Sequence, residues 1–298
     1  MGEQTAYGAT LVPPKKITVP DIVAAKRERR RITMMTAYDA PFAKLVDRAG
    51  IDIILVGDSL GMVVLGHTTT VPVTMDDMVR HAAAVSRGAS RPLLVGDMPF
   101  GSYQASAEEA LRNAARFLKE AGMDAVKVEG GTEVVETVRT LTANGIAVMA
   151  HVGLTPQRVA QLGGFKVQAK TARAARRLID DALALEDAGA FSIVLESVPA
   201  PVAAIATERL DIPTIGIGAG VDCDGQVLVL HDVLGLFGEF KPKFAKRYAD
   251  IGAQVTGALR EFDREVREGS FPTTEHSFTM KDTELASLQR GLAQPKAV

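Results

Sequence analysis

The chain has 298 residues, of which 47% are hydrophobic and 23% are charged, a composition typical of a globular protein with a large apolar core. Its 34 basic and 36 acidic side chains give a formal net charge of −2, which provides no global field for binding nucleic acid or a membrane. The sequence shows neither a run of about 18 apolar residues nor a signal-peptide pattern, and the single cysteine, Cys223, fits a reducing compartment. We therefore expect a cytoplasmic protein that binds neither nucleic acid nor membranes.

Short apolar runs rich in β-branched residues recur along the chain after residues 1–20, a polar segment that we expect to be a flexible arm. Most of these runs lack strict alternation of apolar and polar residues, which is typical of parallel strands buried on both faces. The eight candidate strands span residues 31–38, 52–57, 92–98, 124–130, 146–152, 191–197, 212–218 and 226–232.

Helical patterns lie between the candidate strands. Thr74 precedes two acidic residues that favour a helix N-terminus, and the segment from Ser106 to Glu109 has the pattern of a capping box. Residues 171–190 predict a long amphipathic helix that ends near Gly189. Strands and helices thus alternate along most of the chain.

This alternation predicts an α/β fold, specifically a (β/α)8 barrel, also called a TIM barrel. We assign the barrel to residues 21–270 as a single catalytic domain and residues 271–298 to a polar C-terminal tail. An open, doubly wound sheet is the structural alternative, because it needs no eighth strand.

Residues 57–61, with the sequence GDSLG, match the G-x-S-x-G pattern that carries a nucleophilic serine in α/β-hydrolases. That role requires a helix directly after the serine. The following segment contains β-branched residues, a glycine and a proline, so we expect no helix to begin before Thr74. The pattern therefore argues against Ser59 as a nucleophile and directs attention to Asp58, a carboxylate just beyond the second strand.

Polar side chains gather at the carboxyl ends of five consecutive candidate strands, where barrel enzymes place their catalytic groups. They are Asp58, Asp97, Lys127, Glu129, His151 and Glu196. Four carboxylates brought together are costly to bury without a partner, and a hard divalent cation such as Mg²⁺ takes oxygen ligands of this kind. For any one of these residues a loop cap or a structural salt bridge is the alternative, but the group as a whole predicts an active site.

Eight sequence blocks resemble the ketopantoate hydroxymethyltransferase family. The similarity extends from Thr33 to Tyr248, and the blocks occur in the family's order and spacing. They are TAYD (36–39), ILVGDSLGMV (54–63), VGDMPFGSY (95–103), VKVEGG (126–131), HVGLTPQ (151–157), GGFKVQ (163–168), LESVP (195–199) and IPTIGIGAGVDCDGQVLVLHDVLG (212–235).

The resemblance implies a barrel of the phosphoenolpyruvate/pyruvate superfamily. It implies transfer of a hydroxymethyl group from 5,10-methylenetetrahydrofolate to 3-methyl-2-oxobutanoate, with 2-dehydropantoate and tetrahydrofolate as products. This reaction is the first step toward pantothenate and coenzyme A. Members of the family commonly assemble as homo-oligomers, in particular as decamers.

The resemblance also implies roles for individual residues. The metal, usually Mg²⁺ in the family, would be bound by Asp58, Asp97 and Glu129, and Glu196 would accept the substrate proton. The C3 proton of 3-methyl-2-oxobutanoate is too weakly acidic for an unassisted carboxylate at neutral pH. We therefore expect a metal-stabilised enolate, in which the cation carries the charge that develops on the keto oxygen.

Substrate-binding roles fall on Asp58, Ser59, Asp97 and Lys127 by the same resemblance. Lys127 would add positive charge beside the substrate oxygens. We interpret His151 as a further substrate-binding residue that faces the new hydroxyl or a product oxygen, with a structural role as the alternative.

Two rival functions remain open at this point. A Mg²⁺-dependent lyase or mutase acting on a 2-oxo acid would use the same barrel and the same metal, because fold does not determine reaction. A catalytically silent binding or scaffold protein would have no need of Glu196.

Overall fold

The computed structural model describes residues 15–236 and 242–292. Eight parallel strands form a closed barrel in chain order, so the predicted TIM barrel is confirmed. The strands are β1 (Ile32–Thr36), β2 (Ile53–Val56), β3 (Leu93–Asp97), β4 (Ala125–Glu129), β5 (Ala147–Gly153), β6 (Ser192–Glu196), β7 (Thr214–Ile217) and β8 (Gly225–Leu228). β8 pairs with both β7 and β1, which closes the barrel and makes the open-sheet alternative wrong.

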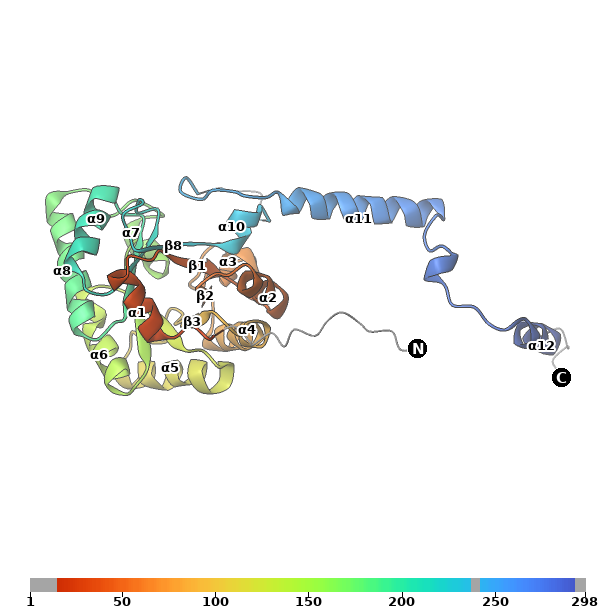
Figure 1. The fold of residues 1–298 in the computed structure, drawn as a ribbon, viewed down its shortest axis with the longest axis horizontal. Helices are drawn as coiled ribbons and strands as arrows, with labels where there is room; N and C mark the ends of the chain where they lie inside the picture. The colour runs from red at the N-terminus through yellow and green to blue at the C-terminus, as the bar shows by residue number, and fades with distance from the viewer. Residues whose placement is uncertain (1–14, 237–241, 293–298) are drawn as a thin grey trace, which may run out of the picture. The chain divides into compact units, whose positions relative to one another are not determined.

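Helices follow the strands and surround the barrel, as Figure 1 shows for α4, α5, α6, α8 and α9. The α-helices are α1 (Val19–Arg27), α2 (Ala40–Arg48), α3 (Leu60–Val63), α4 (Met75–Gly88), α5 (Ala107–Ala121), α6 (Val135–Ala143), α7 (Val159–Leu162), α8 (Ala172–Asp187), α9 (Ala200–Arg209), α10 (Leu230–Leu234), α11 (Ile251–Glu268) and α12 (Asp282–Leu292). Three 3₁₀ turns of the described chain are η1 (Thr132–Val134), η2 (Pro156–Arg158) and η3 (Thr274–His276).

The predicted helix starts are set by side chains that bind free backbone N–H groups. At α4, Thr74 accepts a hydrogen bond from the backbone of Asp77, and Asp77 accepts one in return, so the capping box is complete. At α5, Ser106 accepts from the backbone N–H of Glu109, which is the first half of the expected capping box. The long helix predicted over residues 171–190 is α8.

Two local expectations were wrong. The helical turn α3 begins directly after Ser59, although we expected no helix before Thr74; its apolar side facing the core outweighs the low helix propensity of its residues. The last strand is shorter than the predicted 226–232, because the chain enters α10 at Leu230. In both places tertiary packing overrides a local pattern.

Alternate side chains along each strand pack on opposite sides of the barrel wall. One apolar cluster fills the space between the strands and the surrounding helices and contains Ile54, Leu94 and Val126. A second cluster, which includes Leu93 and Ala125, occupies the barrel interior. The interior positions that follow at the carboxyl ends of the strands are polar, and these form the candidate site.

The amino-terminal end of the barrel is covered by α1. Its buried residues Ile22 and Ala25 belong to the same apolar cluster as the barrel interior, and Ile17 donates a backbone hydrogen bond of 2.7 Å to Arg91 just before β3. Figure 1 shows α1 beside the strands of the barrel. Water is thereby excluded from this end, and the opposite end is left for the site.

The chain divides into two compact units, residues 1–249 and residues 250–298. The second unit contains α11 and α12, whereas we expected the barrel domain to run to residue 270. Most of the arm expected over residues 1–20 lies outside the described residues. Among the described residues, no helix combines the length and the hydropathy needed to span a bilayer.

Candidate active site

The barrel interior brings the predicted polar residues together because of strand periodicity and register. Lys127 and Glu129 lie two residues apart on β4, so both side chains point to the same side of the barrel wall. Asp97 on β3 is the register partner of Lys127, and His151 on β5 is the register partner of Glu129. Three adjacent strands thus place four polar side chains side by side.

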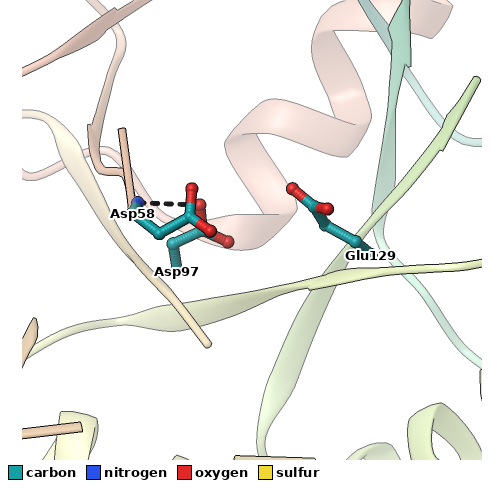
Figure 2. A group of neighbouring side chains, drawn as sticks. All are labelled: Asp58, Asp97 and Glu129. Carbon is teal, nitrogen blue, oxygen red and sulfur yellow. Dashed lines mark hydrogen bonds between the residues drawn. The ribbon is translucent and has the colours of Figure 1, made fainter. Parts of the chain in front are cut away.

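Three carboxylates form a compact acidic cluster, which consists of Asp58, Asp97 and Glu129 (Figure 2). One oxygen of each lies within 4.8 Å of one oxygen of the others, and all three residues are buried. The backbone N–H of Asp58 donates a hydrogen bond of 3.1 Å to Oδ2 of Asp97, which fixes the turn after β2 against β3. Such a group of oxygen atoms is the donor set of a hard divalent cation.

The electrostatic cost of the acidic cluster appears in its pKa values. Burial raises the pKa of Asp58 well above its usual range, and the charges of Asp97 and Glu129 raise it further. Burial also raises the pKa of Asp97, although Lys127 opposes that shift. For these two carboxylates, burial and the neighbouring negative charges therefore outweigh the attraction of the nearby lysine.

Lys127 is the buried cation nearest to the acidic cluster in the described structure. Its Nζ lies 2.7 Å from Oδ1 of Asp97 and 3.3 Å from Oε1 of Glu129. Burial opposes the charged form of the lysine, but the neighbouring carboxylates keep its pKa above the usual value. Burial likewise opposes ionisation of Glu129, but Lys127 and His151 lower the pKa of this carboxyl to about 2.

His151 connects the acidic cluster with Glu196. Its Nδ1 lies 3.3 Å from Oε1 of Glu129, and its Nε2 lies 3.3 Å from Oε2 of Glu196. Burial and the charge of Lys127 lower the pKa of His151, but the two glutamates outweigh them and raise it to about 9. The Glu196 side chain is 15% exposed, whereas that of His151 is 3% exposed. Glu196 is therefore the more accessible of the two to a substrate that enters from solvent.

Ser59 is placed beside the cluster and not within it. Its Oγ lies 2.9 Å from the hydroxyl of Tyr38, and its backbone is in the right-handed helical region at the start of α3. A nucleophilic serine needs a base at its hydroxyl. A neutral tyrosine hydroxyl, whose pKa is raised by burial, does not supply one.

Three polar residues of the site were missed by the sequence analysis. They are Tyr38, Tyr103 and Gln157, which are 3%, 2% and 4% exposed. Gln157 stands at the end of the HVGLTPQ block, and Tyr103 ends the VGDMPFGSY block, so position in a recognised block was the available signal. Both residues bind groups of the acidic cluster through hydrogen bonds across distant parts of the chain.

Residues 16–274 match the sequence profile described as ketopantoate hydroxymethyltransferase. The chain belongs to this family. A relative from Heliobacterium modesticaldum named 3-methyl-2-oxobutanoate hydroxymethyltransferase is 60% identical over 268 residues, which cover 90% of this chain and 97% of that protein. A relative of the same name from Pelobacter propionicus is 56% identical over 264 residues, which cover 89% of this chain and 98% of that protein.

Solved structures share the fold at much lower identity. A phosphonopyruvate hydrolase determined with oxalate and Mg²⁺ is 18% identical, with a TM-score of 0.57 and coverage of 93% of this chain and 97% of that chain. A 2,3-dimethylmalate lyase is 14% identical, with a TM-score of 0.54 and coverage of 94% and 98%. At such low identities, the similarity to these solved structures establishes that the chain shares their barrel fold. It does not establish which reaction the chain catalyses.

Proposed function

We propose that this protein transfers a hydroxymethyl group from 5,10-methylenetetrahydrofolate to 3-methyl-2-oxobutanoate, giving 2-dehydropantoate and tetrahydrofolate. The observation that carries the proposal is the buried set of three carboxylates, a lysine and a histidine that leads to Glu196 at the barrel end. The two relatives at 56–60% identity are named for hydroxymethyl transfer with 3-methyl-2-oxobutanoate. The lyase, by contrast, shares only the fold, so the lyase or mutase alternative has no comparable support.

The residues present fit a resident divalent cation, and Mg²⁺ is the one proposed. Asp58, Asp97 and Glu129 would hold it, because all three are buried and one oxygen of each lies within 4.8 Å of one oxygen of the others. When bound, the cation supplies Lewis-acid stabilisation of negative charge on the keto oxygen of the substrate.

The protein's own side chains perform the proton transfer and the orientation. Glu196 takes the proton from C3 of the substrate, and protonated His151, whose Nε2 lies 3.3 Å away, holds this carboxylate in place as an ion pair. Lys127 attracts the substrate carboxylate and the negative charge that develops beside it. Ser59 contributes its hydroxyl to substrate positioning next to Asp58.

The new carbon–carbon bond joins C3 of the substrate to the one-carbon unit of the folate. The electron pair released when the C3–H bond breaks forms this bond, and both carbon–nitrogen bonds that link the one-carbon unit to N5 and N10 of the folate break. Of the three protons that come from C3 and from water, two end on these nitrogens and one stays on the product hydroxyl. One water is consumed overall, because its oxygen becomes the hydroxyl of the product. The buried walls of the barrel keep bulk water away from the carbanionic centre until the bond has formed.

The assembly that we propose is a homo-oligomer. The resemblance of the sequence to its family implies that this oligomer is a decamer. Apolar side chains recur at helical spacing on one side of α11, at Val255, Leu259, Phe262 and Val266, and each is at least 47% exposed. Such a stripe is suited to contact with another copy of the chain. The cytoplasm is the proposed location, and the buried free thiol of Cys223 is compatible with its reducing conditions.

Deuterium exchange at C3 tests the proposed chemistry without the folate. The protein is incubated with C3-deuterated 3-methyl-2-oxobutanoate and Mg²⁺, and loss of the label is followed by NMR. We expect metal-dependent exchange that falls at least about 100-fold in Glu196→Gln. Glu208→Gln, an exposed glutamate on α9, is the matched control and retains full exchange.

Addition of the folate then separates the transferase from its rivals. Formation of 2-dehydropantoate that depends on 5,10-methylenetetrahydrofolate supports the transfer. Exchange without this product would favour a lyase or mutase, and a folded protein with no exchange would favour a silent scaffold.

A further inference from the structure

Gln157 is a buried glutamine whose hydrogen bonds reach two of the three carboxylates in the acidic cluster. It lies in η2, just after β5. Its side-chain Nε2 donates to Oδ2 of Asp58 at 3.0 Å and to the backbone oxygen of Met98 at 2.9 Å. Its backbone N–H donates to Oε2 of Glu129 at 3.2 Å. Gln157 therefore fixes one oxygen of Asp58 and one oxygen of Glu129, although it belongs to a different segment of the chain from either carboxylate.

The orientation of the Gln157 amide is itself fixed by its surroundings. The hydroxyl of Tyr103 donates to its Oε1 at 2.7 Å, and the side-chain amide of Gln104 approaches the same oxygen at 3.4 Å. Because donors occupy the oxygen end, the NH₂ end must face Asp58 and Met98. Tyr103 is held in turn by the backbone of Glu129, whose N–H lies 3.3 Å from the tyrosine oxygen.

We propose that Gln157 is a positioning residue that holds the carboxylates of Asp58 and Glu129 in place for one divalent cation, with Tyr103 fixing its amide. The inference rests on the proposed function, because it assumes that the acidic cluster is the metal site. It assigns no contact between Gln157 and the substrate. The residue acts through the two carboxylates that it binds.

The neutral amide has an electrostatic advantage over a charged side chain at this position. A second cation beside Lys127 would compete with the metal for the carboxylates, and a fourth carboxylate would add repulsion to a cluster that is already buried. An amide donates two hydrogen bonds without changing the net charge of the site. Donors of this kind around metal ligands restrict ligand rotation and thereby raise metal affinity.

The test compares three variants of the full chain. Gln157→Met keeps the length and neutrality of the side chain, removes the amide that donates to Asp58 and Met98, and keeps the backbone N–H that donates to Glu129. Tyr103→Phe removes only the hydroxyl that fixes the amide. Gln161→Met, at an exposed position on α7 a few residues further along, is the matched control. Mn²⁺ serves as the probe, its dissociation constant is measured by electron paramagnetic resonance, and Tm is measured by circular dichroism.

We expect the dissociation constant for Mn²⁺ to rise about 10- to 100-fold in Gln157→Met, as for other residues that orient metal ligands. Tyr103→Phe should raise it about 2- to 10-fold, the equivalent of one hydrogen bond. Gln161→Met should leave it unchanged. Saturating Mg²⁺ should restore most of the C3 exchange in Gln157→Met but none in Glu196→Gln, because only the first defect lies in metal binding.

Unchanged Mn²⁺ affinity in folded Gln157→Met would overturn the inference and leave the proposed function standing. If this variant does not fold, the affinity of Tyr103→Phe decides in the same way. A fall in Tm without a change in affinity, measured well below Tm, would mean a purely structural role. Failure of the unsubstituted protein to bind Mn²⁺ would instead overturn the proposed metal site, and this inference with it.

Discussion

Nζ of Lys127 lies 2.7 Å from Oδ1 of Asp97, although the two residues belong to different strands and both side chains are at most 4% exposed. The contact follows from register, because the two residues are direct partners across β3 and β4. A buried cation is thus built into the wall of the barrel beside the acidic cluster. Its removal leaves buried carboxylates without their nearest counter-charge.

Lys127→Met should therefore destabilise the metal-free protein by about 3–5 kcal/mol, the cost of breaking a buried ion pair. Urea unfolding in EDTA measures the change, and Lys119→Met on the surface of α5 is the control. In assays with metal, the variant should show a raised KM and a lowered kcat, because the proposed role of the lysine is to attract both the substrate carboxylate and the developing charge. A fully active Lys127→Met would exclude Lys127 from the reaction.

Asp97→Asn should lose metal affinity and activity together. The substitution keeps the volume of the side chain but removes a negative charge from the acidic cluster. We therefore expect the dissociation constant for Mn²⁺ to rise about 100-fold or more. Electron paramagnetic resonance of free Mn²⁺ gives the value. The exposed Asp222→Asn provides the comparison, and full affinity in Asp97→Asn would make the ligand assignment wrong.

Gly96→Ala should destabilise the barrel next to the site. An added Cβ at Gly96 would lie 2.4 Å from Cδ1 of Phe117, whose ring packs on β3 from α5. Overpacking of this kind costs about 1–3 kcal/mol. Urea unfolding should show this loss, whereas Gly257→Ala, where an added Cβ meets no atom within 4 Å, should be neutral or stabilising. Equal stability of Gly96→Ala and the unsubstituted protein would mean that Phe117 can move aside.

The capping box of α4 should make a pH-dependent contribution to stability. Hydrogen bonds from Thr74 lower the pKa of Asp77 below its usual 3.8 in the folded protein. A lowered folded-state pKa means that the contribution is complete above about pH 4 and is lost as the pH falls through the folded-state value. Asp77→Asn should therefore cost about 0.5–1 kcal/mol at pH 6 and almost nothing near pH 2.

Urea unfolding at the two pH values measures the effect of Asp77→Asn. Glu109→Gln is the control, because Glu109 occupies the same helix position in α5 and contributes its backbone N–H to the cap. A cost that is equal at both pH values would contradict an ionic contribution from Asp77.

Leu259→Glu and Phe262→Glu should weaken assembly. Both side chains are more than half exposed in the single chain and belong to the apolar stripe of α11. A carboxylate placed in an apolar interface is costly to bury, so these variants should give smaller species by size-exclusion chromatography with light scattering. Ala253→Glu, on the opposite side of the helix, should keep the size of the unsubstituted protein. A monomer of 31.6 kDa for the unsubstituted chain would rule out the proposed oligomer.

Local patterns were enough to predict the strands, and the starts of α4 and α5 were recognisable from their capping residues. The alternation of strands and helices, together with eight β-rich runs, led to the barrel, which closes as expected. The errors lie where packing competes with propensity. The α3 turn after Ser59 and the start of α10 at Leu230 depend on apolar contacts that no local pattern reveals.

The candidate site was only partly accessible from sequence. Asp97, Lys127 and Glu129 were recognisable because strand periodicity of two and the common end of a parallel barrel place them together. Gln157 was not recognisable from sequence, because its hydrogen-bond partner Asp58 lies 99 residues away along the chain. No periodicity connects a residue of η2 with the turn after β2.

The amino-acid order by itself determined the strand pattern, the barrel class and the polar residues at the strand ends, since each depends on spacing within one short segment. Only the tertiary structure decided which of these groups touch, that Lys127 lies against Asp97, and that Tyr103 and Gln157 support the carboxylates. The physical reason is that a hydrogen bond or an ion pair requires atoms within about 3 Å, and between distant segments that condition is met only when the barrel closes.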